Sequence, residues 1–329
     1  FKKSVFFLKY LFIYFILRFL IENKIINLKY FFITSTLICF FVSFDIILQF
    51  LTGKDIFGFE GVKNNLAGPF GDELIAGGYI QRFSIFSFFL IPLFYKQSFK
   101  NYLKYLIPIS FIVFFITIIL SGNRMPLLLF LFATSLIIIF NKQTRKFFLP
   151  TLVIAIIIFY LFINFNSKVN ENFRAFYDQI SKMTVIVIEK DLKNNYVPPY
   201  LREFLTFYET WKMHKYIGGG IKNFRYYCHH RQHIDKNSKS VCNMHPHNYY
   251  LEILTETGIL GFLLISIFFL SVLHLTFVKK YFTNSVLKNN NIIIPFIFLF
   301  ISEIFPIKST GSFFTTGNTT YLFLIIGIL

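Results

Sequence analysis

The residues best suited to chemistry lie just before and within the start of a long apolar run near the C-terminal end of the chain. His245, His247 and Asn248 precede this run, and Glu252 and Glu256 follow Asn248 four and eight positions later. At helical spacing these carboxylates share one face with Asn248. Histidine, with an ordinary pKa of about 6.5, suits proton transfer near neutral pH and could accept a proton from a hydroxyl nucleophile. The structural alternative is that Asn248 caps a helix and both histidines are solvated.

Three arginines could bind an anion. Arg124 follows a turn of small residues, Arg82 lies within an apolar run, and Arg202 opens a segment of amphipathic spacing. Each also has a structural interpretation, because an arginine at a helix end can anchor it at a membrane surface and an inner or solvated arginine can pair with a carboxylate. The candidate partners are Asp45 for Arg82, and Glu203 or Glu209 for Arg202.

Glycines 218 to 220 permit a close backbone approach, as phosphate-binding loops do. The surrounding residues lack both the GxGxxG and the P-loop pattern, so a nucleotide site is not indicated. A helix end followed by a turn is the structural alternative for Gly218 and Gly220.

Cys228 and Cys242 leave three possibilities open. In an oxidising compartment they could form a disulfide. Alternatively, Cys228 and the histidines that follow it could bind a metal, although the spacing is not that of a zinc finger and Arg231 would oppose a cation. The third possibility is that the two cysteines do neither.

The composition indicates a membrane protein. Hydrophobic residues make up 55% of the 329 residues, and phenylalanine alone occurs 49 times, whereas soluble chains are about 45–50% apolar. The apolar residues form runs of roughly 17–25, the length that crosses a hydrocarbon core. The net charge of +17 resides mostly in loops, so nucleic acid is not an expected partner.

The fold class predicted from these runs is an all-α polytopic membrane protein with about nine transmembrane helices. The chain starts at Phe1 and stops within an apolar run, so we expect it to be a fragment. Lysine-rich short loops alternate along the chain and are assigned to the cytoplasm. The expected spans are 4–22, 30–51, 74–95, 104–120, 124–140, 148–165, 249–278, 292–307 and one from 320.

A long loop, residues 166–248, lies on the opposite side of the membrane in this topology. It carries six of the seven histidines, and a loop of this length is usually functional or disordered. Apolar residues at helical spacing within 198–217 predict an amphipathic helix on the membrane face. We therefore divide the chain into N-terminal transmembrane helices (1–165), this external loop with short helices (166–248), and C-terminal transmembrane helices (249–329).

Taken together, these stretches resemble the O-antigen ligase/polymerase superfamily of bacterial membrane proteins. The histidine segment matches its His-x-His-Asn-x-x-Leu and Glu-x-Gly-x-x-Gly pattern, and three further stretches agree in order along about residues 65–265. The matching residues of the histidine segment are His245, His247, Asn248, Leu251, Glu256, Gly258 and Gly261. The further stretches are Ala67 to Asp72, Ser121 to Arg124, and Arg202 with Trp211 and the glycine pattern Gly218 to Phe224.

Two features depart from the family pattern. Tyr216 and Ile217 stand where the family often has proline before the glycines, and the histidine- and cysteine-rich insert 226–243 has no recognised counterpart.

The resemblance implies a metal-independent, inverting glycosyltransferase without a cofactor. Its donor would be an undecaprenyl-diphosphate-linked glycan, and its acceptor lipid A-core (ligase) or another repeat unit (polymerase). Arg124, Arg202 and Arg82 would clamp the diphosphate, and His247 would act on the acceptor hydroxyl with His245 in a secondary role.

The remaining residues of the resemblance receive supporting roles. Gly218, Gly220 and Asn248 would help to bind substrate, whereas Glu256, Gly258 and Gly261 would hold the helix start and its packing. The resemblance also implies lipopolysaccharide biosynthesis at the bacterial inner membrane, with the active site on the periplasmic face.

Two other functional classes are weighed against this one. A polysaccharide or lipid transporter would carry binding residues at the bilayer midplane and internal repeats, whereas the polar groups here gather on one outer face. A metal- or redox-sensing membrane protein would rest on the cysteine and histidine cluster of residues 228–247 alone.

Overall fold

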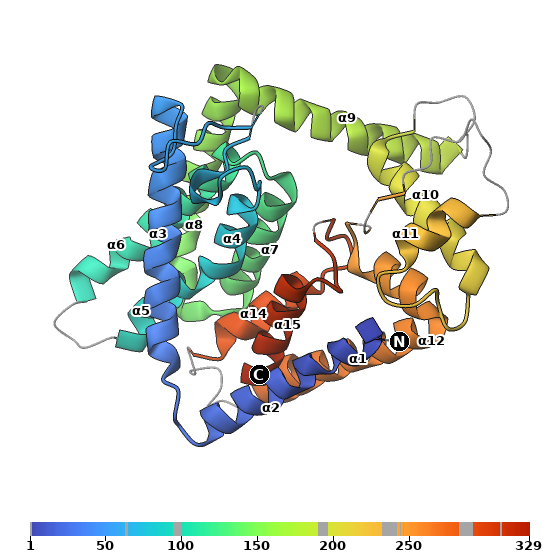
Figure 1. Cartoon of the computed structure of the whole chain (residues 1–329). Coiled ribbons are helices and arrows are strands. Elements are labelled where there is room, and N and C mark those ends of the chain that lie inside the picture. Colours follow the sequence, from blue (N-terminus) through green and yellow to red (C-terminus); the bar gives the residue numbers. More distant parts are fainter. Residues whose placement is uncertain are drawn as a thin grey trace. The chain divides into compact units, whose positions relative to one another are not determined.

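The computed structural model describes residues 2–62, 65–94, 100–189, 197–231, 242–243, 245, 247–282, 292–309 and 311–329. Over these residues the chain is helical and contains no strand, only two isolated bridges in the loop after the third helix (Figure 1). This confirms the predicted all-α class for the described part of the chain. Gln232, His233 and the lysines at 96 and 288 lie outside it.

The helices vary widely in length. In chain order the α-helices are α1 (Lys2–Phe7), α2 (Lys9–Glu22), α3 (Leu28–Thr52), α4 (Ala76–Phe83), α5 (Ile85–Phe94), α6 (Lys100–Leu120), α7 (Arg124–Phe140), α8 (Lys142–Phe165), α9 (Ser167–Glu189), α10 (Pro199–Trp211), α11 (Phe224–Tyr227), α12 (Tyr249–Leu273), α14 (Ile294–Glu303) and α15 (Thr316–Ile328). Shorter 3₁₀ turns are η1 (Gly68–Phe70), η3 (Lys212–His214) and η4 (Cys228–His230), and a π-helical stretch, η5 (His274–Phe282), continues α12.

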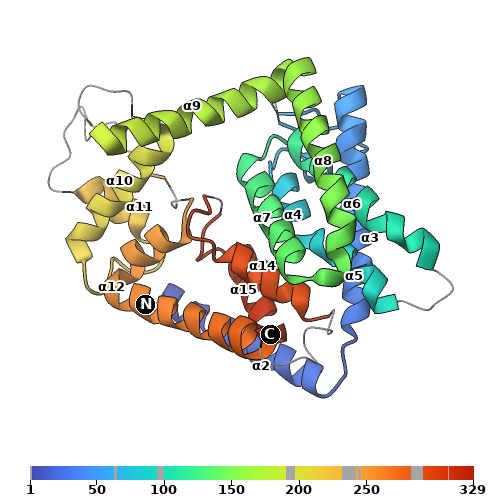
Figure 2. The same ribbon diagram turned by 180° about the vertical axis from the view of Figure 1, so that it is seen from behind.

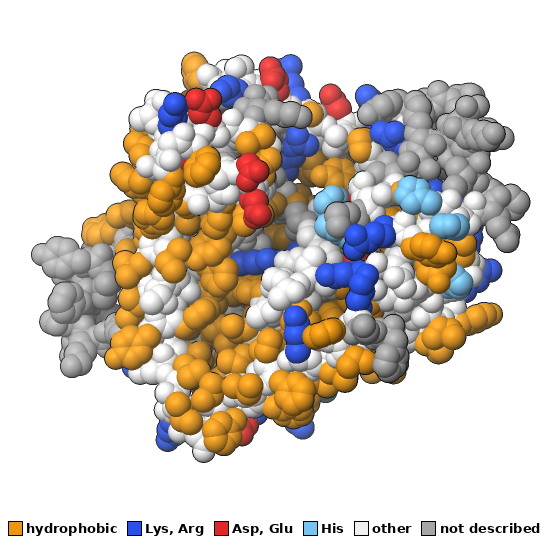
Figure 3. All heavy atoms as spheres, in the orientation of Figure 1, with side chains coloured by type: hydrophobic (Ala, Val, Ile, Leu, Met, Phe, Trp, Pro, Cys, Tyr) orange, Lys and Arg blue, Asp and Glu red, His pale blue; other side chains and the backbone are white. Residues whose placement is uncertain are grey.

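Three helical stretches are long and apolar enough to cross a membrane: Leu28–Thr52, Arg145–Phe165 and Tyr249–Lys279. They coincide with the second, sixth and seventh predicted spans. The first predicted span is interrupted at Leu8 and the third at Ser84, and the remaining predicted spans correspond to shorter apolar helices. Hydrophobic side chains are exposed over much of the face drawn in Figure 3, as expected of a multi-pass membrane protein. The count of nine stays a prediction.

The chain forms two compact units that interleave in sequence. One comprises residues Phe1–Asn23, Tyr177–Lys280 and Glu303–Leu329, and is called the histidine unit here because it contains His245 and His247. The other comprises Lys24–Phe176 and Tyr281–Ser302, and is called the arginine unit because it contains Arg82 and Arg124.

Aromatic packing holds the arginine unit together. Phe88 of α5 meets Phe148 of α8 edge to face at 5.0 Å between ring centroids, and Phe111 of α6 stacks on Phe130 of α7 at 5.4 Å. All four rings are buried. Lipid tails are as apolar as these rings, so close packing rather than exclusion of water is what favours the association of the helices.

The turn between α6 and α7 brings α4 close to the start of α7. Gly122 has a φ of 72°, and the Asn123 side chain donates a hydrogen bond to the Ser121 carbonyl at 3.0 Å. Gly77 of α4 packs so closely on this turn that an added Cβ would lie 2.5 Å from Ser121 Oγ. Arg124 therefore starts its helix on a rigid turn.

In the histidine unit, α10 and α11 pack beside the first turns of α12, as both Figure 1 and Figure 2 show. Phe207 of α10 stacks on Phe224 of α11 with ring centroids 3.5 Å apart, and Thr255 of α12 donates a hydrogen bond to the Phe207 carbonyl. The apolar side of α10 is thus partly covered by protein. The predicted amphipathic helix exists, and part of its apolar face packs against α12. Its place on the membrane face stays a prediction.

Helix α12 is broken at Gly258, where φ is 68° and ψ is −173°. The turn formed by residues 215–222, called the glycine turn here, enters the break. The N–H groups of Gly219 and Gly220 donate to the carbonyls of Thr255 (3.1 Å) and Glu256 (2.8 Å). In return, the N–H groups of Ile259 and Leu260 donate to the carbonyls of Lys215 (2.9 Å) and Tyr216 (3.2 Å).

This exchange replaces two helical hydrogen bonds with four bonds to the inserted turn. In an intact helix the N–H of residue 259 would donate to the carbonyl of residue 255, and that of 260 to 256. The break would otherwise leave these groups without partners inside the protein, which costs about 1–3 kcal/mol for each group. The glycine turn and the broken helix therefore stabilise each other.

Gly218→Ala tests this arrangement. Gly218 has a φ of 73°, and an added Cβ would lie 2.4 Å from the carbonyl carbon and oxygen of Glu256. Left-handed strain of about 1–2 kcal/mol adds to an overpacking cost of about 1–3 kcal/mol. We expect a clear fall in the melting temperature of the purified protein in detergent. Gly317→Ala, which meets no atom within 4 Å at an ordinary φ, is the control and should melt like the wild type. Equal melting temperatures for both variants would contradict the interpretation.

Candidate functional site

Asn248 fixes the start of α12 with both ends of its amide. Its Oδ1 accepts hydrogen bonds from the N–H groups of Tyr250 (3.0 Å) and Leu251 (3.1 Å), which is an N-cap. Its Nδ2 donates to the carbonyls of Pro306 (2.8 Å) and Lys308 (3.2 Å). The capping role considered from the sequence is therefore present, and the same side chain also ties the helix to the segment after α14. The role in substrate binding stays a prediction.

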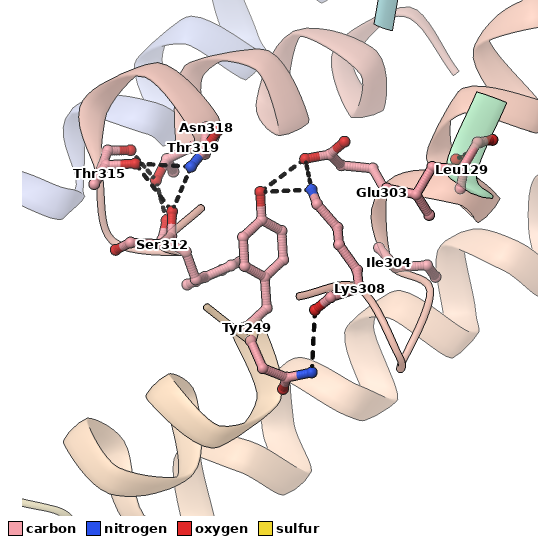
Figure 4. Close-up of polar contacts among 12 residues, drawn as sticks. Leu129, Tyr249, Glu303, Ile304, Lys308, Ser312, Thr315, Asn318 and Thr319 are labelled. Atoms are coloured by element: carbon pink, nitrogen blue, oxygen red, sulfur yellow. Dashed lines mark hydrogen bonds and ion pairs between the residues drawn. The ribbon is translucent and has the colours of Figure 1, made fainter. Parts of the chain in front are cut away.

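A buried ion pair lies directly beside this cap (Figure 4). Lys308 pairs with Glu303 and also donates to the Tyr249 hydroxyl at 3.0 Å, and that hydroxyl donates to Glu303 at 2.7 Å. All three side chains are buried. Every charge in this cluster thus has an opposite charge or a hydrogen bond, as burial requires.

One turn further along α12, Glu252 is also buried, and both of its carboxylate oxygens accept hydrogen bonds. Its carboxylate accepts hydrogen bonds from Ser312 Oγ at 2.6 Å and from the N–H of Phe313. These contacts hold the start of α12 rigidly to residues 303–313. His245 and His247 therefore directly precede a helix start that is held firmly in place.

His247 faces a buried carboxylate. Its Nε2 lies 4.0 Å from Oε1 of Glu203 on α10, and the side chain of His247 is 42% exposed whereas that of Glu203 is only 5% exposed. Asn243 donates a hydrogen bond to the same Glu203 oxygen. The arrangement places a buried acidic side chain beside one accessible imidazole.

Sequence reasoning considered Glu203 only as a partner for its neighbour Arg202. The signal that could have found it is its place on the buried side of α10: Thr206, Phe207 and Thr210 are also buried, and all lie three to seven positions after Glu203. A carboxylate on the buried side of an amphipathic helix needs a partner from elsewhere in the fold.

His245 lies beside His247, with ring centroids 5.4 Å apart. Burial lowers the pKa of His245 below its ordinary value, and the nearby His247 and Lys222 lower it further. His245 is therefore more firmly neutral at pH 7 than a solvated histidine, and a neutral imidazole can accept a proton.

The glycine turn brings a cation to the same region. Lys222 adopts a φ of 59°, an uncommon conformation for a residue with a side chain, and its N–H donates to the Glu256 carboxylate. Glu256 is 2% exposed, and its Oε2 accepts no hydrogen bond from any residue that the structure describes. Lys222, His245 and the two carboxylates Glu252 and Glu256 interact electrostatically. Lys222 was not a candidate from the sequence.

Three of the glycines named from the sequence are closely packed in the structure. Gly218 and Gly258 face each other across the break in α12, where neither has room for a Cβ, and Gly261 packs on the side chain of Thr257. Gly220 has a φ of 93° and donates to the Glu256 carbonyl. Substrate binding by Gly218 and Gly220 stays a prediction.

The predicted arginines are divided between the two units. Arg202 is partly buried on α10 in the histidine unit, next to Glu203. Arg124 and Arg82 belong to the arginine unit, on helices that pack together: Arg124 lies 5.8 Å from the ring centroid of Phe176, and Arg82 is in the last turn of α4. The suggested partner of Arg82, Asp45, accepts a hydrogen bond from the Ile56 N–H at 2.8 Å.

Cys228 and Cys242 form a disulfide, with their Cα atoms 5.7 Å apart. It packs against Phe207, Phe224 and Leu251. Among the residues that the structure describes there is no group of three or more potential metal ligands. Of the possibilities considered for Cys228, the structure therefore supports the disulfide. Cys242 is followed directly by Asn243, which donates a hydrogen bond to Glu203.

Arg231, which follows the histidine pair of the insert, is paired within the fold. Its Nη1 donates to Glu209 of α10 at 2.7 Å, and its Nε donates to the Cys228 carbonyl at 3.0 Å. The described part of the insert is thus tied to α10 by an ion pair as well as by the disulfide cluster.

Comparison with protein families gives one match. The family model described as O-antigen ligase matches residues 109–266. This range includes α7, α10, the glycine turn and the head of α12, and it excludes Arg82. A comparison with curated proteins finds no match.

The lowered pKa of His245 predicts a pH-dependent stability. Above about pH 6.5 the residue is neutral in both the folded and the unfolded chain. As the pH falls below that value the unfolded chain binds a proton first, so the free energy of unfolding decreases. We expect the melting temperature of His245→Gln to fall less than that of the wild type when the pH is lowered from 7.5 to 5.5. His229→Gln, at an exposed position, is the control and should follow the wild type. If the melting temperature of His245→Gln fell with pH as much as that of the wild type, the lowered pKa of His245 would not be the cause.

Proposed function

Because residues 109–266 match the family model described as O-antigen ligase, we propose that the chain is a membrane glycosyltransferase with an undecaprenyl-diphosphate-linked glycan as donor. The acceptor is a hydroxyl of lipid A-core in a ligase, or of another repeat unit in a polymerase. The observation that carries the proposal is accessible His247 beside buried Glu203 at the head of a rigidly held helix. Both residues lie within the matched range.

In the proposed reaction His247 is the base. The acceptor oxygen attacks the anomeric carbon of the donor sugar and forms the glycosidic bond. The bond from that carbon to the diphosphate oxygen breaks, and its electron pair leaves with the diphosphate. The hydroxyl proton passes to His247, whose Nε2 faces Glu203, so that Nδ1 is the accepting nitrogen. The Glu203 carboxylate stabilises the imidazolium that forms, and attack opposite the leaving group inverts the anomeric centre.

Cationic side chains are proposed to bind the diphosphate as its charge develops. Guanidinium groups suit this task because they form paired hydrogen bonds with phosphate oxygens. Arg202, Arg124 and Arg82 are assigned this role by the family resemblance. The same resemblance assigns Gly218, Gly220 and Asn248 to substrate binding.

The disulfide supports the proposed location of the site. Disulfides persist in oxidising compartments such as the bacterial periplasm, and Cys228 and Cys242 lie on the same loop as the histidines. We therefore place His247 on the periplasmic face of the inner membrane, the side opposite the lysine-rich short loops.

His247→Ala and Arg202→Ala test the mechanism in a bacterium that carries the gene. Each variant is expected to abolish the surface polysaccharide seen on immunoblots, because the first removes the base and the second a diphosphate ligand. The membrane level of the protein should stay as in the wild type. His229→Ala, on the exposed η4 turn, is the control and should retain polysaccharide. Normal glycan in His247→Ala would refute the role of the histidine.

The lipopolysaccharide of a deletion strain separates the two kinds of transferase. A core that bears a single repeat identifies a polymerase, because only chain extension is lost. Bare core together with accumulated lipid-linked polymer identifies a ligase. A full wild-type ladder in the deletion strain would overturn the proposed function itself.

Glu203→Gln tests the carboxylate beside His247. The amide keeps an oxygen for the Asn243 hydrogen bond but removes the charge. We expect kcat for glycan transfer in vitro to fall at least about tenfold, with KM for the donor and the melting temperature unchanged, since the charge acts on the transition state. Glu203→Asp should recover part of the rate. Glu60→Gln, an exposed carboxylate, is the control. A raised KM with unchanged kcat would show that Glu203 binds substrate instead.

A further inference from the structure

An exposed aromatic and basic surface lies at the end of α10 and in the turn after it. Tyr208, Tyr216 and Ile217 are 45%, 72% and 79% exposed, respectively. Lys212 extends over the ring of Tyr208, with its Nζ 4.4 Å from the centroid. We refer to residues 208–217 as the aromatic-basic turn. Exposed side chains of this size require an explanation, because folded proteins seldom leave contiguous apolar patches in water.

Backbone hydrogen bonds fix the aromatic-basic turn to a definite level of α12. The carbonyls of Lys215 and Tyr216 accept from the N–H groups of Ile259 and Leu260, directly after the break at Gly258. Trp211 Nε1 donates to the Lys215 carbonyl at 3.0 Å and so closes the turn on itself. The aromatic-basic turn is therefore held to α12 by backbone hydrogen bonds.

The surface of α12 changes character at that level. Before the break it buries polar side chains, among them Glu252 and Glu256. After the break the helix exposes large apolar side chains, and Leu260, Leu264 and Ile267 are 55%, 69% and 60% exposed. This exposed apolar face belongs to a stretch long and apolar enough to cross a membrane. Its beginning marks the depth at which hydrocarbon would replace water.

The aromatic-basic turn stands where the headgroup layer of a bilayer would be. Tyrosine and tryptophan are enriched at this depth, because their rings are apolar with one polar atom. Lysines beside them extend to lipid phosphates. The charges also favour an anionic surface: Lys212 and Lys215 are exposed, whereas Glu209, the acidic residue of the turn, already pairs with Arg231.

From these observations we propose that the aromatic-basic turn docks onto the headgroup layer of an anionic phospholipid bilayer and anchors the histidine unit at that depth. The contact is made by the exposed end of α10 and by Tyr216 and Ile217. It does not use the apolar face of α10, which is partly covered by α12. The proposal concerns membrane contact and does not depend on glycan transfer.

Trp211 makes the proposal testable, because it is the only tryptophan of the chain. The full chain is reconstituted in nanodiscs with a tryptophan-free belt, made of phosphatidylcholine and phosphatidylglycerol that carry bromine either just below the headgroups or near the chain ends. An interfacial segment enters only about 5–10 Å, so shallow bromine should quench the emission at least about twofold more than deep bromine. Trp211→Phe should remove the signal. Quenching by aqueous acrylamide without quenching by either brominated lipid would place the surface in water or against another macromolecule and would overturn the proposal.

Charge variants test the preference for anionic lipid. The double variant Lys212→Gln, Lys215→Gln keeps Trp211 and should lose a substantial share of the shallow quenching in discs that contain phosphatidylglycerol. Lys168→Gln, which removes an exposed lysine of α9, is the control and should quench as the wild type does. An unchanged double variant, or an equal loss in the control, would refute the role of the two lysines.

Discussion

The histidine unit depends on the hydrogen bonds that the broken α12 and the glycine turn exchange. A helix whose backbone is shielded from water cannot end or bend without new partners for its backbone groups, because each shielded group without one costs free energy. Here the carbonyls of Thr255 and Glu256 and the N–H groups of Ile259 and Leu260 find those partners in residues 215–220. These four hydrogen bonds fix the register of the turn on the helix. Everything attached to it, from Trp211 to Lys222, is placed by that register.

Buried carboxylates impose the second constraint. Glu303 is neutralised by Lys308, Glu252 accepts two hydrogen bonds, and Glu203 accepts one from Asn243 and faces His247. A buried charge with missing partners would be strongly unfavourable, so these pairings specify how the helix start and the loop fit together. Glu256, with one buried oxygen that accepts no hydrogen bond from any described residue, departs from this pattern at the bend of the helix. Departures of this kind are characteristic of functional sites.

The disulfide links these two constraints. Cys242 precedes Asn243, and its bond to Cys228 holds that part of the chain against Phe207 and Phe224. The amide that binds Glu203 is thus restrained from one side by a covalent bond and positioned from the other by α10. The insert that sets this chain apart from the family pattern therefore contributes directly to the surroundings of His247.

The sequence by itself determined what depends on neighbouring residues. Apolar runs predicted the helical class and nine spans, of which three coincide with helical stretches long and apolar enough to cross a membrane. Asn248 was considered as a helix cap, which requires only residues two and three positions away. Tertiary structure decided what depends on distant segments: the approach of Glu203 to His247, the place of Lys222, the choice of disulfide over metal, and the break at Gly258. The physical reason is the sequence separation over which each interaction acts. Helix periodicity and capping act within about one turn of chain, whereas partners for buried charges and broken backbone bonds can come from any segment that folding brings near.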